Sequence, residues 1–127
     1  MFILTLYGRA GCPMCIAGIS WLEKEGIAYT FRDIFQDPLT KEELYGLGKK
    51  LREGLFDLYA PKGARKRGLS EDSKSYSAEQ IVQFQTENPD MIRYPVFDLG
   101  DRLIFGFKEE TKSLLLSLLG GKKISQG

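Results

Sequence analysis

Two cysteines in the spacing Cys-x-x-Cys offer the most direct chemistry in this sequence. They lie in the segment Cys12-Pro13-Met14-Cys15, and the 127-residue chain has no other cysteine and no histidine. Without histidine, the Cys-His and Ser-His pairs that activate many nucleophiles are excluded. Two thiols cannot complete a tetrahedral zinc site alone, because such a site needs four nitrogen or sulfur ligands. The pattern therefore indicates a redox-active dithiol.

The predicted local structure gives the two thiols different roles. Residues 2–7 form the short apolar run of a buried strand, and a turn of residues 8–11 follows. A helix then begins at Cys12 or Pro13, since proline is tolerated in the first helical turn. The N–H groups at a helix N-terminus favour the thiolate, which is the nucleophilic form of cysteine, so Cys12 is expected to attack a disulfide. Cys15 lies one turn further along nearly the same face and is expected to resolve the mixed disulfide.

The remaining elements indicate which fold surrounds the dithiol. Gly26 ends the first helix, and residues 27–33 alternate well enough for a second strand. Near the other end of the chain, residues 94–99 and 102–105 predict a hairpin around a Gly-Asp turn. Two glutamates at 109–110 then open a final helix, where carboxylates suit the helix dipole.

Between these two parts, the chain is expected to form a helical insert over about residues 38–88. Capping boxes at residues 40–43 and 77–80 mark the starts of two helices. Residues 55–59 favour one or two helical turns, whereas the charged residues 62–74 predict an exposed loop with some helix.

The final helix is expected to end at the two glycines 120–121, leaving residues 122–127 as a flexible tail. Its core face should consist of leucines, namely Leu114, Leu115, Leu118 and Leu119. The whole order of elements predicts a single α/β domain with the thioredoxin-like fold over residues 1–121. This fold has a four-stranded mixed sheet with helices on its faces.

Residues just before the third strand are candidates for the far side of the site. In the thioredoxin fold, a proline that begins this strand lies opposite the dithiol after a cis peptide bond, so we expect a cis bond between Tyr94 and Pro95. The alternative is an ordinary proline at the start of an edge strand. Arg93 would stabilise a thiolate or hold an anionic substrate, or else it lies in solvent. A basic cluster in the insert is either a solvated surface or a docking site for an acidic partner: Lys62, Arg65, Lys66 and Arg67.

Together these motifs resemble the arsenate reductase ArsC/Spx family of thioredoxin-like proteins. The matches lie within residues 2–118, at 6–7, 11–15, 21–22, 32–35, 38–40, 43–44, 88–89, 92–96 and 106–107. The resemblance implies a helical insert inside a thioredoxin fold. Proline as the second residue of the dithiol motif also resembles glutaredoxins, but their Thr-Val-Pro is absent because Arg93 and Tyr94 precede Pro95.

The dithiol and the family resemblance together leave three functions open. The first, which we expect, is thiol–disulfide oxidoreduction by Cys12 and Cys15, and hence an enzyme. The alternative is an Spx-like redox-sensing regulator whose dithiol is a switch and which binds the RNA polymerase α subunit. The second alternative is an arsenate reductase, in which Cys12 matches the nucleophile and Arg93 matches one arginine of the oxyanion site. Residues 106–107 offer no arginine for that site.

Composition restricts the expected partners and location. A net charge of +1 gives no reason to expect binding to nucleic acid or to a membrane surface. The apolar start of the chain has no basic segment before it, unlike a signal peptide, so we expect a cytoplasmic protein. We expect a monomer with no tightly bound cofactor or metal, acting on a disulfide substrate or a redox partner protein. Glutathione or thioredoxin is the expected external electron donor.

Overall fold

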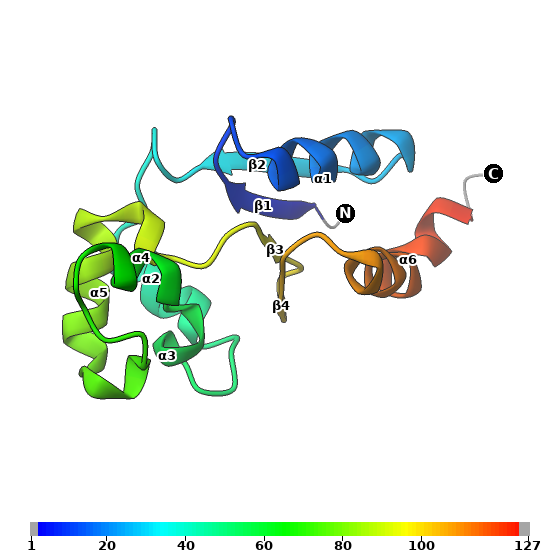
Figure 1. The fold of residues 1–127 in the computed structure, drawn as a ribbon. Helices are drawn as coiled ribbons and strands as arrows, with labels where there is room; N and C mark the ends of the chain where they lie inside the picture. The colour runs from blue at the N-terminus through cyan, green and yellow to red at the C-terminus, as the bar shows by residue number, and fades with distance from the viewer. Residues whose placement is uncertain (1–2, 125–127) are drawn as a thin grey trace.

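A mixed four-stranded sheet in the order β2-β1-β3-β4 is the framework that positions the dithiol (Figure 1). The computed structural model of the chain describes residues 3–124. β1 (Leu4–Gly8) pairs in parallel with β2 (Tyr29–Asp33) and antiparallel with β3 (Val96–Asp98). β4 (Leu103–Phe105) completes the sheet by pairing antiparallel with β3. The predicted thioredoxin-like fold with a mixed sheet is confirmed.

The helices of the described chain surround this sheet on both faces. They are α1 (Pro13–Lys24), α2 (Lys41–Gly48), α3 (Leu55–Leu58), α4 (Pro61–Lys66), α5 (Ala78–Glu87) and α6 (Glu109–Ile124), with short 3-10 turns η1 (Ser73–Ser75) and η2 (Pro89–Met91). The helices α2 to α5 lie between β2 and β3 in the chain, which confirms the predicted helical insert. As predicted, the charged segment 62–74 contains some helix, because α4 and η1 overlap it.

An apolar cluster lies on each face of the sheet, because alternate residues of a strand point to opposite faces. On one face, Leu6 of β1 packs with Leu22 of α1 and Leu115 of α6. On the other face, Tyr7 and Val96 pack against the core of the insert. Figure 1 shows the same arrangement, with the insert on one side of β3 and β4 and α6 on the other.

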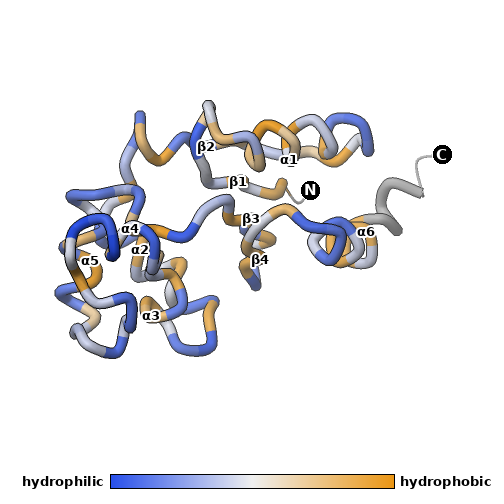
Figure 2. Tube along the Cα trace, in the orientation of Figure 1, coloured by the Kyte–Doolittle hydropathy of each residue, from blue (hydrophilic) through white to orange (hydrophobic). Residues whose placement is uncertain are grey.

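Local capping interactions explain where the insert helices begin. The Thr40 hydroxyl accepts the Glu43 N–H at 3.1 Å, and the Glu43 carboxylate accepts the Thr40 N–H at 2.9 Å. Ser77 and Gln80 form the same reciprocal pair at the start of α5. Both predicted capping boxes are therefore confirmed. Hydrophobic and hydrophilic residues alternate along these helices (Figure 2). Among the described residues, none of the helices combines the length and the apolar character that a membrane span requires.

The end of α6 differs from the prediction. The helix continues through the glycines at 120–121 to Ile124, so the tail predicted at 122–127 is wrong for 122–124, and 125–127 lie outside the described residues. A glycine inside a helix costs only about 1 kcal/mol relative to alanine. It ends a helix when it adopts the left-handed conformation, and not by its presence alone.

The leucine face predicted for α6 is also partly wrong. Leu115 is buried and Leu119 is half-buried, whereas Leu114 and Leu118 are 47% and 39% exposed. Buried Thr111 lies one turn before Leu115. The contact with the sheet is thus a single row of residues spaced by four, and the neighbouring row of leucines faces outward.

Candidate active site

The dithiol lies where β1 passes into α1, as predicted. Cys12 is the residue before the helix, with extended backbone, and Pro13 occupies the first helical turn. The Cys12 N–H donates to the Arg9 carbonyl at 3.0 Å, and the Cys12 carbonyl accepts the Ile16 N–H at 2.9 Å. Both cysteines are free thiols; Cys12 is half-buried and Cys15 is buried. The structure therefore presents one accessible thiol and one enclosed thiol, one helical turn apart.

Asp33 at the end of β2 holds the turn that precedes Cys12. Its carboxylate accepts the N–H of Ala10 at 3.1 Å and the N–H of Phe35 at 2.9 Å, and also that of Gln36 at 3.2 Å. Partial desolvation raises the pKa of this carboxyl, but the N–H donors outweigh it and hold the pKa below its ordinary value. Asp33 lies within the family-like segment 32–35, but this role was not predicted from the sequence.

Cys15 is enclosed by the strand and by the turn. Its Sγ accepts the Arg9 N–H at 3.4 Å, and a Cβ built on Gly8 would lie only 2.3 Å from the same sulfur. Gly8 therefore provides the space that the thiol occupies. Burial raises the pKa of Cys15 to about 12; the Arg9 N–H lowers it, and a hydrogen bond with the Cys12 side chain raises it further. Cys15 is thus a protonated thiol beside Cys12 at neutral pH.

The opposite side of the site is formed by the segment before β3. The peptide bond between Tyr94 and Pro95 is cis, which confirms the prediction, and Pro95 is buried. Burial raises the pKa of Tyr94, and the negative charge that Cys12 or Cys15 carries when ionised raises it further, so the phenol lies within electrostatic range of the dithiol. Its ring packs edge-on against Phe35, with 5.4 Å between ring centroids. Tyr94 was not among the predicted site residues; its place directly before the strand proline is the signal in the sequence that points to it.

Arg93 points toward the insert and β4. Its Nη1 donates to the Asp57 carbonyl at 3.1 Å, and its guanidinium lies 4.0 Å from the centre of the Phe105 ring. Within the described chain, no hydrogen bond joins Arg93 to either thiol. Another cation lies nearer the dithiol: Arg9, whose guanidinium is 5.6 Å from the centre of the Phe35 ring and whose charge lowers the pKa of both Cys15 and Tyr94.

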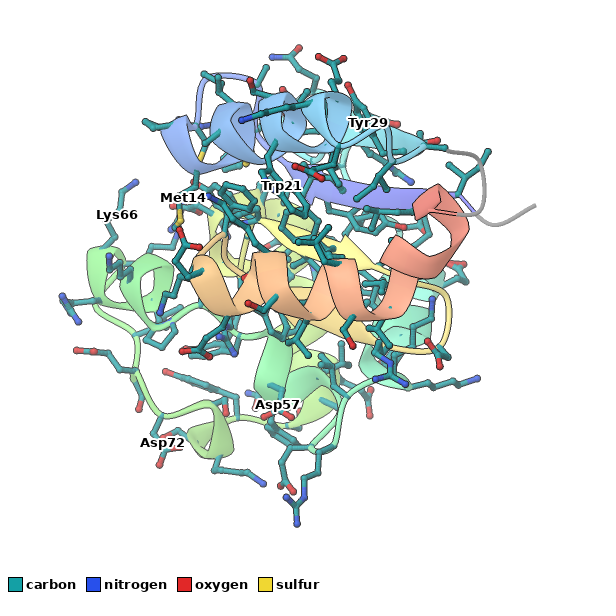
Figure 3. The ribbon with its side chains drawn as sticks, turned by 90° about the vertical axis from the view of Figure 1, so that its right-hand side faces the viewer. Met14, Trp21, Tyr29, Asp57, Lys66 and Asp72 are labelled. Atoms are coloured by element: carbon teal, nitrogen blue, oxygen red, sulfur yellow. The ribbon has the colours of Figure 1, made fainter. Side chains whose placement is uncertain are left out.

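A groove of about 630 Å³ adjoins the site at Tyr94. We call it the basic groove; its lining residues come from 60–66, 90–94 and 105–108. Three residues of the predicted basic cluster line it, namely Lys62, Arg65 and Lys66, whereas Arg67 does not. Lys66 of α4 and Met14 of the dithiol motif lie on the same side of the view in Figure 3.

Ion pairs neutralise much of the basic cluster. Arg65 pairs with Glu71 at 2.8 Å, Arg67 pairs with Asp90 at 2.9 Å, and Lys66 pairs with the same aspartate at 3.3 Å. The described residues contain no group of three or more histidine, cysteine or acidic side chains arranged to hold a metal ion.

Comparisons with known proteins agree with this architecture. A glutaredoxin family model matches residues 4–51, which include both cysteines. The global transcriptional regulator Spx of Listeria innocua is 27% identical over 108 residues, covering 85% of this chain and 82% of the relative. A solved arsenate reductase (ArsC) related protein from Brucella melitensis is 27% identical with a TM-score of 0.66, covering 88% of this chain and 92% of that one. The solved YffB protein is 26% identical with a TM-score of 0.71, covering 87% and 96%.

Proposed function

This chain belongs to the ArsC/Spx family of thioredoxin-like proteins, and we propose that it acts as a thiol–disulfide oxidoreductase. The observation that carries the proposal is the asymmetry of its two thiols. Cys12 is only half-buried and directly precedes the first turn of α1, where a substrate disulfide can reach its sulfur. Cys15 is buried against Gly8 with a strongly raised pKa, so it remains a thiol until Cys12 has reacted.

The proposed reaction has two exchange steps. The Cys12 thiolate attacks one sulfur of the substrate disulfide, forms a mixed disulfide and releases the other sulfur as a thiolate. Cys15 then attacks the Cys12 sulfur and gives up its proton to a released substrate sulfur, which closes the Cys12–Cys15 bond and leaves the substrate as one thiol and one thiolate. Two electrons pass from the protein to the substrate. The Arg9 N–H, 3.4 Å from the Cys15 sulfur, would stabilise the negative charge that develops there.

An external dithiol, or two molecules of a monothiol, must reduce the disulfide again for each turnover. Glutathione and thioredoxin are the donors that we propose, and both belong to the reducing environment of the cytoplasm, where we place the reaction. The substrate would be a small disulfide or a partner protein, acted on by a monomer.

Turnover with defined donors tests the proposal. Purified protein would be assayed for reduction of a small disulfide, with glutathione or thioredoxin supplied in excess. We expect Cys12→Ser to abolish reduction, because the attacking sulfur is lost. Cys15→Ser should retain only those reactions in which glutathione resolves the mixed disulfide. Absence of turnover with every donor, in protein shown to be folded, would reject the enzymatic proposal.

A regulatory function is the second candidate, because the matched Spx relatives are named global transcriptional regulators. In that case the dithiol would be a switch, and the partner would be the RNA polymerase α subunit. Reduced and oxidised protein would be passed over immobilised α subunit. Retention that depends on the redox state, together with no turnover, would favour the regulator over the enzyme.

Arsenate reduction is a weaker candidate. It is raised by the name of the Brucella relative, but it requires free cations that hold an oxyanion beside the nucleophilic sulfur. Arg65 and Arg67 are engaged in ion pairs, and Arg93 lies against Phe105 and the Asp57 carbonyl, with no hydrogen bond to either thiol in the described chain. We therefore expect little turnover with arsenate under conditions in which a disulfide is reduced.

A further inference from the structure

We propose that the basic groove binds an acidic polypeptide segment that flanks the disulfide of the substrate. The inference rests on the proposed oxidoreductase function and specifies the class of substrate. The groove has a volume of about 630 Å³, within the range of about 300–1,000 Å³ that is typical of ligand sites.

The cations that remain available come from separate elements and meet at this groove. Lys62 of α4, Arg93 before β3 and Lys108 after β4 all line it. In the part of the chain that the structure describes, none of them forms an ion pair with a carboxylate, in contrast to Arg65 and Lys66. Their charges are therefore free for a ligand. Carboxylates are the complementary groups that a polypeptide can supply.

The lining between these cations is apolar and aromatic. Phe105, Tyr94 and Ile92 contribute to it, and the Arg93 guanidinium stacks 4.0 Å from the centre of the Phe105 ring. An inorganic oxyanion would satisfy the charges but would leave this surface uncovered. A polypeptide segment that combines carboxylates with aliphatic side-chain atoms would cover both kinds of surface, which favours an acidic polypeptide over an inorganic anion.

The groove is joined to the dithiol through Tyr94. This residue lines the groove and directly precedes the buried cis Pro95. The other wall is held firmly, because α4 packs backbone to backbone against η2: a Cβ on Gly63 would lie 2.3 Å from the Asp90 carbonyl oxygen. A segment bound between these walls would therefore hold a neighbouring disulfide close to Cys12.

Activated peptide disulfides provide the probe. Two pentapeptides would carry a central cysteine as its 2-thiopyridyl disulfide, flanked on each side by two glutamates in one and by two glutamines in the other. Attack by Cys12 releases thiopyridone, and attack by Cys15 then releases the peptide thiol, so single turnovers need no added reductant. The rate at increasing peptide concentration separates affinity from the chemical step.

The variant K62Q/K108Q removes two charges from the groove, and K41Q/K49Q removes two exposed charges on or next to α2 as a matched control. We expect the wild type and the control to prefer the acidic peptide through tighter binding. In K62Q/K108Q, this preference, measured as the ratio of the affinities for the acidic and the neutral peptide, should fall by about 2- to 30-fold, as expected for two exposed ion pairs.

Equal reaction of both peptides with the wild type would overturn the inference and leave the oxidoreductase proposal intact. An equal loss of preference in both double variants would also overturn it, since the effect would be one of overall charge. Glutathione sulfonate serves as an unreactive competitor. If glutathione sulfonate slows the reaction of the wild type but not that of K62Q/K108Q, and the wild type shows no preference for the acidic peptide, the groove is assigned to a small anionic thiol instead. Failure of both peptides to react would count against the proposed function itself.

Discussion

Gly8→Ala should destabilise the protein through one specific contact. Alanine is normally tolerated better than glycine inside a strand, by roughly 0.5–1 kcal/mol. Here its Cβ would lie 2.3 Å from the Cys15 Sγ and 3.5 Å from the Cys15 Cβ, whereas ordinary contacts lie at 3.4–4 Å. The sulfur must retreat by about 1 Å or more. It then weakens its bond with the Arg9 N–H and shifts the first turn of α1.

Overpacking of this kind in a core costs about 1–3 kcal/mol, so we expect Gly8→Ala to lower the free energy of unfolding by about 2 kcal/mol. Urea denaturation measures this value. Gly46→Ala is the matched control, because a Cβ at that position meets nothing within 4 Å. The displaced Cys15 should also resolve mixed disulfides more slowly, which a single-turnover assay would detect.

A double-mutant cycle isolates the contact. In a Cys15→Ala background, the sulfur is absent and the added methyl group has room. The cost of Gly8→Ala should then disappear, giving a coupling of about 1–3 kcal/mol. An equal cost of Gly8→Ala in both backgrounds would refute the reasoning, because the destabilisation would then have another source.

Further predictions concern reactivity, pH dependence and capping. Iodoacetamide at neutral pH should label Cys12 but not Cys15, which is buried with a pKa of about 12. Peptide mapping by mass spectrometry measures the label at each cysteine, and comparable labelling of both would contradict this prediction. The hydrogen bond from Arg32 holds the pKa of Glu43 below its ordinary value of 4.5. The stability that this pair contributes is therefore present above pH 4.5 and is lost as the pH falls through the lower folded value, and Glu43→Gln should show a flatter acid dependence in denaturation curves. Ser77→Ala, which removes a capping box, should cost about 1 kcal/mol in urea denaturation; no loss would mean that water replaces the cap.

Much of the fold follows from short-range patterns in the sequence. The capping boxes at Thr40 and Ser77 were predictable because each uses residues three positions apart. The start of α1 at Pro13 was predictable for the same reason, and it places Cys12 and Cys15 one turn apart. The course of α6 was harder to predict, because a glycine pair is compatible with a helix and because the pattern of leucines does not say which row meets the sheet.

The candidate site was predictable only in its chemical centre. The dithiol is a contiguous motif, so the sequence alone was enough to predict the chemistry that we propose for it. Asp33, Tyr94 and Gly8 reach it from other strands or from the preceding turn. Contacts between residues distant in the sequence depend on strand pairing, such as Gly8 opposite Asp33 in β1 and β2. The same holds for charge: the sequence shows a run of cations, but only the tertiary structure decides which of them acidic residues neutralise and which remain free in the groove.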